Sequence, residues 1–200
     1  INKKTKAILI VHIYGLPVDV TPIIKVARKR KILVIEDAAE QIGQTYKNKP
    51  IGSFGDISTF SFFINKHITT GEGGMICTNS KKLKDRFEIL RNISFQPKKQ
   101  KFIHEELGWN YRMTNMQAAI GLAQLEKIKF FIKLKRKMGN FYNKKFYKLD
   151  ALQLPISKDN FSENIYWVYP LIIKEKKIKT KKIINELKKK GIEARPFFCP

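Results

Sequence analysis

A lysine in apolar surroundings is the residue best suited to covalent chemistry in this chain. Lys66 is the only lysine in the stretch Phe54 to Met75, FGDISTFSFFINKHITTGEGGM. The apolar run Ile57 to Ile64 precedes it, and small residues and glycines follow. An amine kept from water and from other charges loses its proton more readily, so this pattern favours a nucleophilic lysine. The alternative is a lysine whose stem covers apolar surface while its ammonium group stays in solvent.

Two acidic residues follow a predicted buried strand. Glu36 and Asp37 come directly after the apolar run Ile32 to Ile35. Ligands of α/β folds bind at the carboxyl ends of parallel strands, so these carboxylates stand where a ligand would lie. Asp37 is equally suited to cap a short helix over the following AAEQIG segment, and the two roles are compatible.

Alternating strands and helices are predicted to position these groups. Ala7 to Val11 and Ile32 to Ile35 are typical of buried strands. Between them we expect a helix that begins at Thr21-Pro22, with Thr21 as its cap, and ends near Lys31. This order predicts a βαβ unit and a parallel sheet. The next predicted elements are a turn at Tyr46 to Pro50 and strands over Asp56 to Phe63 and Gly74 to Thr78. They are followed by a helix that Ser80 caps and that runs to about Asn92, and by an exposed loop over Phe95 to Glu106.

A long helix is predicted to open the last third of the chain. Thr114 and Gln117 form a capping box at its start. An unbroken helix to Leu149 would be about 50 Å long at ~1.5 Å per residue, so we expect a bend or break near Gly139-Asn140. Beyond Pro155 the expected elements are a strand over Ile165 to Ile173 with Pro170 at an edge or bulge, a helix over Thr180 to Lys190 with Gly191 as its cap, and a strand from Ile192 to Arg195.

The net charge of +23 is the unusual feature of the composition. Of the 40 basic residues 33 are lysines, and many alternate with apolar residues at helical spacing. Nucleic-acid sites favour arginine clusters with stacking aromatics, and the sequence has none, so we expect no specific nucleic-acid partner. A lysine-rich binding protein that acts through its charge is the alternative.

Other classes of protein are not indicated. The longest apolar runs are far shorter than a membrane span, and no secretory signal is visible. Cys77 and Cys199 have no partner motif, so neither a metal site nor a disulfide framework is expected. We therefore expect a cytoplasmic protein without a membrane partner.

Three motifs together resemble the DegT/StrS-type sugar aminotransferases, which depend on pyridoxal 5'-phosphate (PLP). They are EDAAEQIG, GSFGDISTFSFFINKHITTGEGGM and LGWNYRMTNMQAAIGLAQLE, and the resemblance runs from Ala7 to Pro200. It implies an α/β fold of the aspartate aminotransferase-like class of PLP-dependent transferases, with a mixed, mostly parallel sheet flanked by helices. It also implies that residues 1–130 are part of the large PLP-binding domain, 131–154 a connecting helix, and 155–200 the beginning of a small α+β domain.

The resemblance gives five residues a role. Lys66 forms the Schiff base with PLP and then moves protons at the substrate carbon. Asp37 pairs with the pyridine nitrogen, whose protonation makes the ring an electron sink. Ser61 donates its hydroxyl to the cofactor phosphate, and Glu40 matches a position beside the cofactor ring. Asn110 resembles a residue that reaches the phosphate in the neighbouring subunit, although by itself it would be a loop amide capping its own turn.

Glu40 and the GWNYRMTN segment resemble the perosamine synthase-like members. This implies a homodimer that aminates the 4-keto group of a GDP-linked 4-keto-6-deoxymannose with glutamate as donor, for O-antigen polysaccharide biosynthesis. Three alternatives stay open: another 3- or 4-keto sugar linked to UDP or dTDP, a PLP-dependent dehydration, or a non-catalytic basic binding protein on this fold. Some dehydratases of the family have histidine in place of the lysine, so Lys66 followed by His67 favours transamination.

Members of this family carry further residues before the position of Ile1. These include a helix start that binds the phosphate and an aromatic residue that stacks on the cofactor ring. Since a helix N-terminus is a strong phosphate site, we expect the 200 residues alone to bind PLP weakly or not at all. For the structure we expect the Lys66 nitrogen and the Asp37 carboxylate to lie close enough to bracket one aromatic ring.

Overall fold

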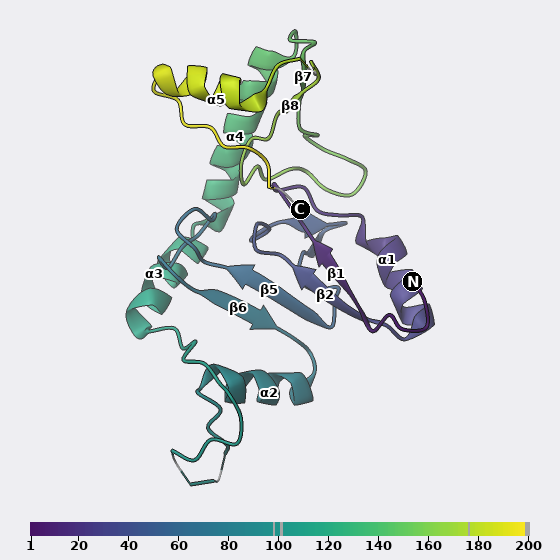
Figure 1. Ribbon diagram of the computed structural model, residues 1–200, viewed down its shortest axis with the longest axis vertical. Helices are drawn as coiled ribbons and strands as arrows, with labels where there is room; N and C mark the ends of the chain where they lie inside the picture. The colour runs from purple at the N-terminus through teal and green to yellow at the C-terminus, as the bar shows by residue number, and fades with distance from the viewer. Residues whose placement is uncertain (98, 101, 176, 199–200) are drawn as a thin grey trace.

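A four-stranded sheet forms the centre of the protein (Figure 1). The computed structural model describes residues 1–97, 99–100, 102–175 and 177–198. In the order β1-β2-β5-β6, the strands β1 (Ala7–Val11), β2 (Leu33–Asp37) and β5 (Ile57–Ser61) are parallel, and β6 (Gly74–Cys77) is antiparallel to β5. The mixed, mostly parallel sheet predicted from the sequence is therefore confirmed.

Helix α1 (Val20–Arg30) connects β1 to β2 and packs on one face of the sheet. Its N-cap is Asp19, whose carboxylate accepts the Thr21 N–H at 3.3 Å. The prediction of Thr21 as cap was therefore wrong by two residues, while Pro22 does lie in the first turn, where its missing N–H costs nothing. Lys31 is the C-cap and adopts the left-handed conformation, so the helix ends where it was predicted to end.

The two faces of the sheet differ in cover. The core under α1 contains Ile10, Val20, Ala27, Val34, Ala38, Tyr46 and Ile51. On the opposite face Leu9, Leu33 and Ile76 are 61%, 53% and 52% exposed. Within the described residues, the chain therefore packs one face of this sheet and leaves the other largely open.

Short hairpin and helical elements follow along the chain. β3 (Thr45–Tyr46) and β4 (Lys49–Pro50) pair across the turn Lys47–Asn48, as predicted. Helix α2 (Lys81–Arg91) begins after Ser80, whose hydroxyl accepts the Leu83 N–H, and this cap is also confirmed. The segment between α2 and α3, where it is described, is mostly exposed and without helix or strand.

The long helix is broken, but not where the sequence suggested. α3 (Asn115–Leu125) has the predicted capping box of Thr114 and Gln117, and α4 (Ile128–Phe146) begins after a break at Glu126–Lys127. Gly139 lies inside α4, where a Cβ would come within 2.5 Å of the Tyr166 ring. The glycine therefore permits close packing, and the predicted bend at Gly139-Asn140 was wrong.

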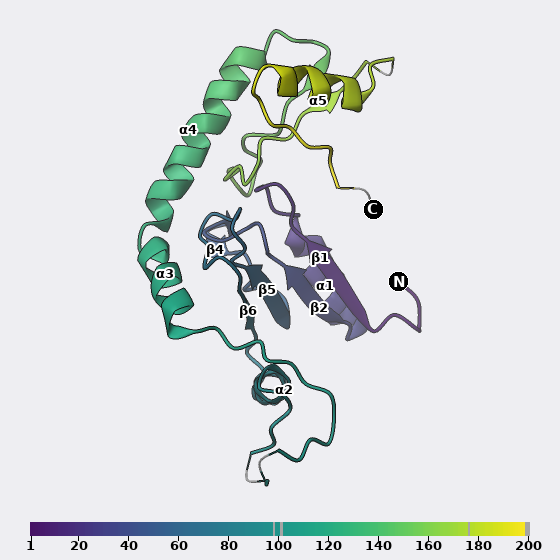
Figure 2. The ribbon, with the colours of Figure 1, turned by 60° about the vertical axis from the view of Figure 1, so that its left-hand side comes forward.

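The C-terminal elements lie at the far end of α4 from α3 (Figure 2). β7 (Leu152–Gln153) pairs with β8 (Ile172–Ile173), and α5 (Thr180–Lys189) follows. The cap of α5 is Lys190, one residue before the predicted cap Gly191, which has φ +75°. Most of the predicted strand Ile165 to Ile173 is irregular, and within it Tyr166 has φ +47°, which a strand does not allow. The strand predicted from Ile192 to Arg195 is not formed either.

Two remaining observations concern cysteines and helices. Cys77 has a free thiol, whereas Cys199 lies outside the described residues. Among the residues that the structure describes, none of the helices is long and apolar enough to cross a membrane.

Candidate functional site

The loop after β5 holds Lys66 and is closed by hydrogen bonds at its base. The Phe62 carbonyl accepts the Thr70 N–H and the Thr69 hydroxyl, both at 2.9 Å, and the Phe62 N–H donates to the Gly73 carbonyl at 2.9 Å. Gly73 has φ +149°, and a Cβ there would come within 2.5 Å of the Thr70 hydroxyl. The threonines and glycines after the lysine therefore shape a tight loop that presents Lys66 beside the sheet.

The amine of Lys66 lies in a mostly buried, charged environment. Its side chain is 12% exposed, and Nζ lies 3.9 Å from Oε1 of Glu40 and 4.2 Å from the centre of the Trp167 ring. Burial lowers the pKa of Lys66 below its usual value, although the charges of Glu40 and Asp37 act to raise it. Lys66 is thus the poorly solvated amine that the sequence pattern favoured, and not a lysine with its head in bulk solvent.

Glu40 faces Lys66 from the turn after β2. The segment after Asp37 forms turns, so the helix predicted over AAEQIG is absent. Oε2 of Glu40 accepts the Tyr14 N–H at 2.6 Å. Burial raises the pKa of Glu40, and the Tyr14 hydrogen bond and the charge of Lys66 only partly oppose this. Burial therefore disfavours the charge on both partners of this pair.

Asp37 is the last residue of β2 and approaches the same place. Its carboxylate accepts the Ala39 N–H at 3.1 Å, so it caps a turn and not a helix. It pairs in register with Thr59 of β5, and Ser61 lies two residues further along that strand. Since alternate residues of a strand share a face, Asp37 and Ser61 lie on one face of the sheet.

Asp37 affects the ionisation of the two other charged residues of the site. Its charge acts on both Lys66 and Glu40 and favours the protonated form of each. Ser61, which is half-buried, accepts the Phe63 N–H at 3.3 Å and still has its hydroxyl hydrogen to donate. The carboxyl end of β2 and the end of β5 therefore hold four of the five predicted site residues.

Asn110 is the predicted residue that lies elsewhere. It is exposed, between α2 and α3, where its side-chain oxygen accepts the Arg112 Nε–H at 2.8 Å. Within the described part of the chain, no hydrogen bond or ion pair links it to Lys66, Asp37, Glu40 or Ser61. Asn110 therefore lies apart from the other four predicted site residues.

Comparison with known sequences decides the family. The model of the DegT/DnrJ/EryC1/StrS aminotransferase family matches residues 1–200. The chain belongs to this family. The GDP-perosamine synthase of Escherichia coli O157:H7 is 46% identical over 200 residues, which cover 100% of this chain and 54% of that protein. The enzyme of the same name from Caulobacter vibrioides is 43% identical over 201 residues, with the same two coverages. The chain thus spans about half the length of the curated relatives it matches.

Solved structures share the fold. PseC of Helicobacter pylori, an aminotransferase involved in the biosynthesis of pseudoaminic acid, has a TM-score of 0.89 at 31% identity, over 100% of this chain and 54% of that one. A GDP-4-keto-6-deoxymannose-3-dehydratase with a trapped PLP-glutamate geminal diamine has a TM-score of 0.86 at 32% identity, over 98% and 54%. A variant of the same dehydratase with bound GDP-perosamine has a TM-score of 0.85 at 30% identity, over 96% and 54%. The expected fold of PLP-dependent transferases is confirmed.

Two aromatic residues near the DegT-family lysine, Trp167 and Tyr14, were missed from the sequence, and so was the burial of His67. Trp167 donates its indole N–H to the Asn65 carbonyl at 2.8 Å, and Tyr14 stacks on the Trp167 ring. His67 lies 3.2 Å from the Ile165 carbonyl, and burial lowers its pKa to about 4. The aromatic run IYWVY was a visible signal, but it was interpreted as a strand face.

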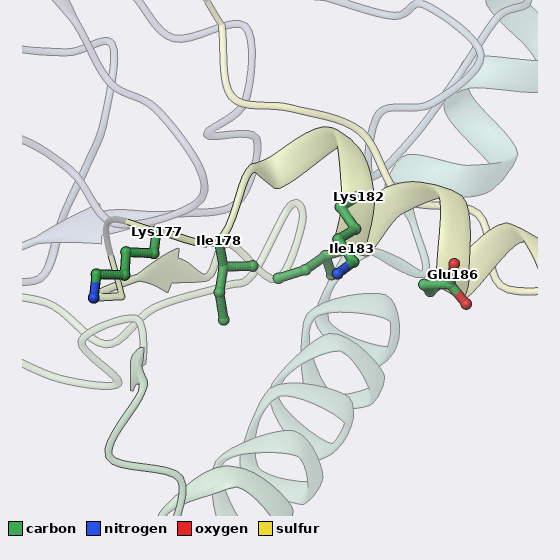
Figure 3. A pocket seen from close by; sticks show the side chains of 5 residues that line it. All are labelled: Lys177, Ile178, Lys182, Ile183 and Glu186. Atoms are coloured by element: carbon green, nitrogen blue, oxygen red, sulfur yellow. The ribbon is translucent and has the colours of Figure 1, made fainter.

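Two surface pockets lie away from Lys66. The first, of about 290 Å³, is lined by Lys177, Ile178, Lys182, Ile183 and Glu186 of α5 and the segment before it (Figure 3). The second lies between α1 and the region of β4 and contains Thr21, Ile24 and Lys49. Neither contains a predicted site residue, so the site of this DegT-family chain is identified by its charged groups and not by a pocket.

Proposed function

We propose that this chain carries the lysine-bearing part of a PLP-dependent aminotransferase. The amino group passes from glutamate to a keto-deoxy nucleotide sugar of the GDP-4-keto-6-deoxymannose type, which yields GDP-perosamine. One observation carries the proposal: a buried amine of lowered pKa, Lys66, faces one carboxylate at 3.9 Å and feels the charge of a second. The identity to GDP-perosamine synthases supports the choice of sugar.

The residues at the site fit this cofactor. PLP, when bound, supplies the electron sink for charge that develops on the substrate carbon. Lys66 would provide the amine that bonds to it, because its lowered pKa makes the unprotonated form more available. Asp37 would hold the proton on the pyridine nitrogen, and Ser61 would donate its hydroxyl to the phosphate.

Lys66 and Glu40 would share the proton work. An amine released from the cofactor would hold or deliver a proton at Nζ, at the point where the substrate carbon must lose and gain one. Glu40 lies 3.9 Å from that nitrogen and is anchored by the Tyr14 N–H. Its charge would favour the protonated amine when the proton must be held.

A trapping experiment tests the lysine. The intact protein is incubated with PLP, reduced with borohydride and mapped by peptide mass spectrometry. The cofactor mass is expected on the Lys66 peptide and should vanish in Lys66→Ala. Lys133→Ala, at an exposed lysine of α4, is the matched control and should keep the label. A label on another lysine, or one that survives Lys66→Ala, would overturn the proposal.

A product analysis tests the substrate and the reaction. The intact protein is incubated with glutamate and with GDP-, UDP- and dTDP-linked keto sugars in turn. The expected product carries an amine in place of a carbonyl on the GDP sugar. Amination of a UDP or dTDP sugar would keep the aminotransferase and change its substrate. Loss of an oxygen without gain of nitrogen would instead show a dehydratase, the activity that two of the structural relatives are named for.

The organisation of the enzyme is also part of the proposal. Residues 1–130 would belong to the large domain, 131–154 to a connecting helix, and 155–200 to the beginning of the small domain. We further propose a cytoplasmic homodimer in which Asn110 completes the site of the neighbouring subunit. Two observations support the dimer. Asn110 is exposed and apart from Lys66, and three apolar residues within six positions of it in the sequence, Leu107, Tyr111 and Met116, are 75%, 72% and 77% exposed.

A further inference from the structure

The segment around Trp167 is fastened to the loop that carries Lys66. The Trp167 indole N–H donates to the Asn65 carbonyl at 2.8 Å, directly before Lys66. His67, directly after it, lies 3.2 Å from the Ile165 carbonyl. The Trp167 carbonyl in turn accepts a hydrogen bond from Lys135 of α4 at 3.0 Å. Both neighbours of Lys66 are therefore tied to one short segment, which lies about a hundred residues further along the chain.

The ring of Trp167 faces the amine itself. Nζ of Lys66 lies 4.2 Å from the ring centre, within the range of a cation–π contact. Tyr14 stacks nearly parallel to this ring, at 6.4 Å and 7°, and its N–H holds Glu40. Trp167 is only 7% exposed. The amine thus lies between an aromatic face and a carboxylate, and a second aromatic residue supports both.

We propose that Trp167 is a positioning residue for Lys66: its indole N–H fixes the loop, and its ring holds the amine as a cation whenever the amine is free. This inference rests on the proposed function of Lys66 as the amine that bonds the cofactor. A desolvated ammonium ion is costly, and a π face offsets part of that cost without adding a further negative charge. The ring therefore keeps a buried amine able to carry a proton.

The charged groups around the amine act in different directions. Glu40 and Asp37, from the turn after β2 and its last residue, favour the ammonium form. Lys135 of α4 points to the Trp167 carbonyl, and His67 is neutral at pH 7 because burial lowers its pKa to about 4. The ring contribution must therefore be measured with both carboxylates in place.

The experiment measures how fast each lysine is acetylated by a limiting amount of acetic anhydride, as a function of pH. The intact protein is used without PLP, and peptide mass mapping identifies Lys66. Only the unprotonated amine reacts, so loss of the ring in Trp167→Leu should raise the rate at pH 7 by roughly threefold or more. Trp167→Phe keeps an aromatic face and should stay within about a factor of two of wild type.

A second readout separates the N–H from the ring. Both variants lose the indole N–H, so amide hydrogen exchange in residues 62–70 should quicken in both. Phe141→Leu is the matched control, because it removes an exposed contact of Lys145 with an aromatic ring at 5.5 Å. It should leave the rate at Lys66 and the exchange of this loop unchanged.

Equal acetylation rates in wild type and Trp167→Leu, or equal increases in the Leu and Phe variants, would overturn the role of the ring. Unchanged exchange in both would overturn the role of the N–H. If Trp167→Leu does not fold, 5-fluorotryptophan replaces tryptophan, since fluorine weakens the π face and keeps the N–H; no change in rate then overturns the proposal. Because PLP is absent throughout, failure of cofactor trapping on Lys66 would refute the proposed function and leave this result intact.

Discussion

At the residue scale, burial and charge oppose each other in the pair of Lys66 and Glu40. Their 3.9 Å separation is too long for a hydrogen bond, so neither charge is fully compensated. Burial lowers the pKa of Lys66 and raises that of Glu40, and both shifts favour the neutral pair. An amine in this balance changes its protonation with a small change in its surroundings, which suits a group that must both bond and carry a proton.

Replacing Glu40 by glutamine tests this balance. The Glu40 charge raises the pKa of Lys66, so Glu40→Gln should lower that pKa further and increase the acetylation rate of Lys66 at neutral pH. The glutamine oxygen still accepts the Tyr14 N–H, which keeps the turn in place. Glu163→Gln, which removes the 3.4 Å partner of Arg136, is the control and should leave Lys66 unchanged. A slower reaction in Glu40→Gln would contradict the account.

The buried side chain of His67 should make the stability of the protein depend on pH. Its pKa is about 4 in the folded protein against 6.5 ordinarily, so the unfolded chain binds more protons between these values. Lowering the pH from 6.5 to 4 should therefore cost about 3 kcal/mol of unfolding free energy through this residue alone. Other acids also titrate at the lower end, so the measurement is the difference between wild type and His67→Gln in urea unfolding at several pH values.

Glutamine retains a donor for the Ile165 carbonyl and does not titrate. At pH 7 the free energies of unfolding of His67→Gln and wild type should be similar. At pH 4 the variant should be more stable relative to wild type than it is at pH 7. Parallel stability curves for the two proteins across this range would show that His67 is not the titrating group.

At the element scale, local signals predicted most of the regular structure, and contacts distant in sequence decided the rest. The apolar run of β1 and the caps Ser80 and Thr114 act within a few residues, so their elements were predicted correctly. Tyr166 follows a β-rich pattern but adopts φ +47°, and its ring packs on Gly139 of α4. Sequence periodicity does not report such a contact.

The same division applies to the candidate site. Lys66, Asp37, Glu40 and Ser61 come from two neighbouring strands and the loops after them, so motif and topology together predicted their meeting. Trp167 joins them from a segment that had been predicted as a strand. Its role depends on how α4 and the following segment fold back, which no local pattern specifies.

Gly139 should tolerate no side chain. The alanine Cβ would meet the Tyr166 ring at 2.5 Å, and that ring is 1% exposed with its hydroxyl held by Asn143 at 3.2 Å. Overpacking costs about 1–3 kcal/mol, against a helix-propensity gain of about 1 kcal/mol, so Gly139→Ala should lose up to about 2 kcal/mol in urea unfolding. Asn140→Ala, at the exposed neighbour in the same helix, should change stability little. Equal stability of the two variants would show that α4 and Tyr166 do not pack as described.

At the scale of the whole molecule, one predicted site residue lies apart from the other four. Four of the predicted residues gather at the sheet, while Asn110 lies in the exposed segment between α2 and α3. Three exposed apolar side chains, Leu107, Tyr111 and Met116, lie within six residues of it in the sequence. A twofold dimer would cover this surface and bring each Asn110 to the other subunit's site, which is the arrangement we propose.

Complementation between two inactive variants tests this arrangement. Intact proteins with Lys66→Ala and with Asn110→Ala should each lose most aminotransferase activity. Co-expressed in equal amounts, they should recover about a quarter of the wild-type activity, because half of the dimers are hybrids and each hybrid contains one site with both residues intact. The measurement is the amination rate of purified mixed dimers, with their mass confirmed by light scattering.

A second pair of variants makes the result specific. Asp37 and Lys66 are proposed to act in the same subunit, so co-expression of Lys66→Ala with Asp37→Asn should recover no activity: every site of a hybrid lacks one residue or the other. Recovery in this pair would mean that Asp37 and Lys66 serve different sites. Failure of the Asn110 pair to recover, with hybrid dimers present, would place Asn110 in the same site as Lys66 or in none, and the shared-site dimer would be refuted.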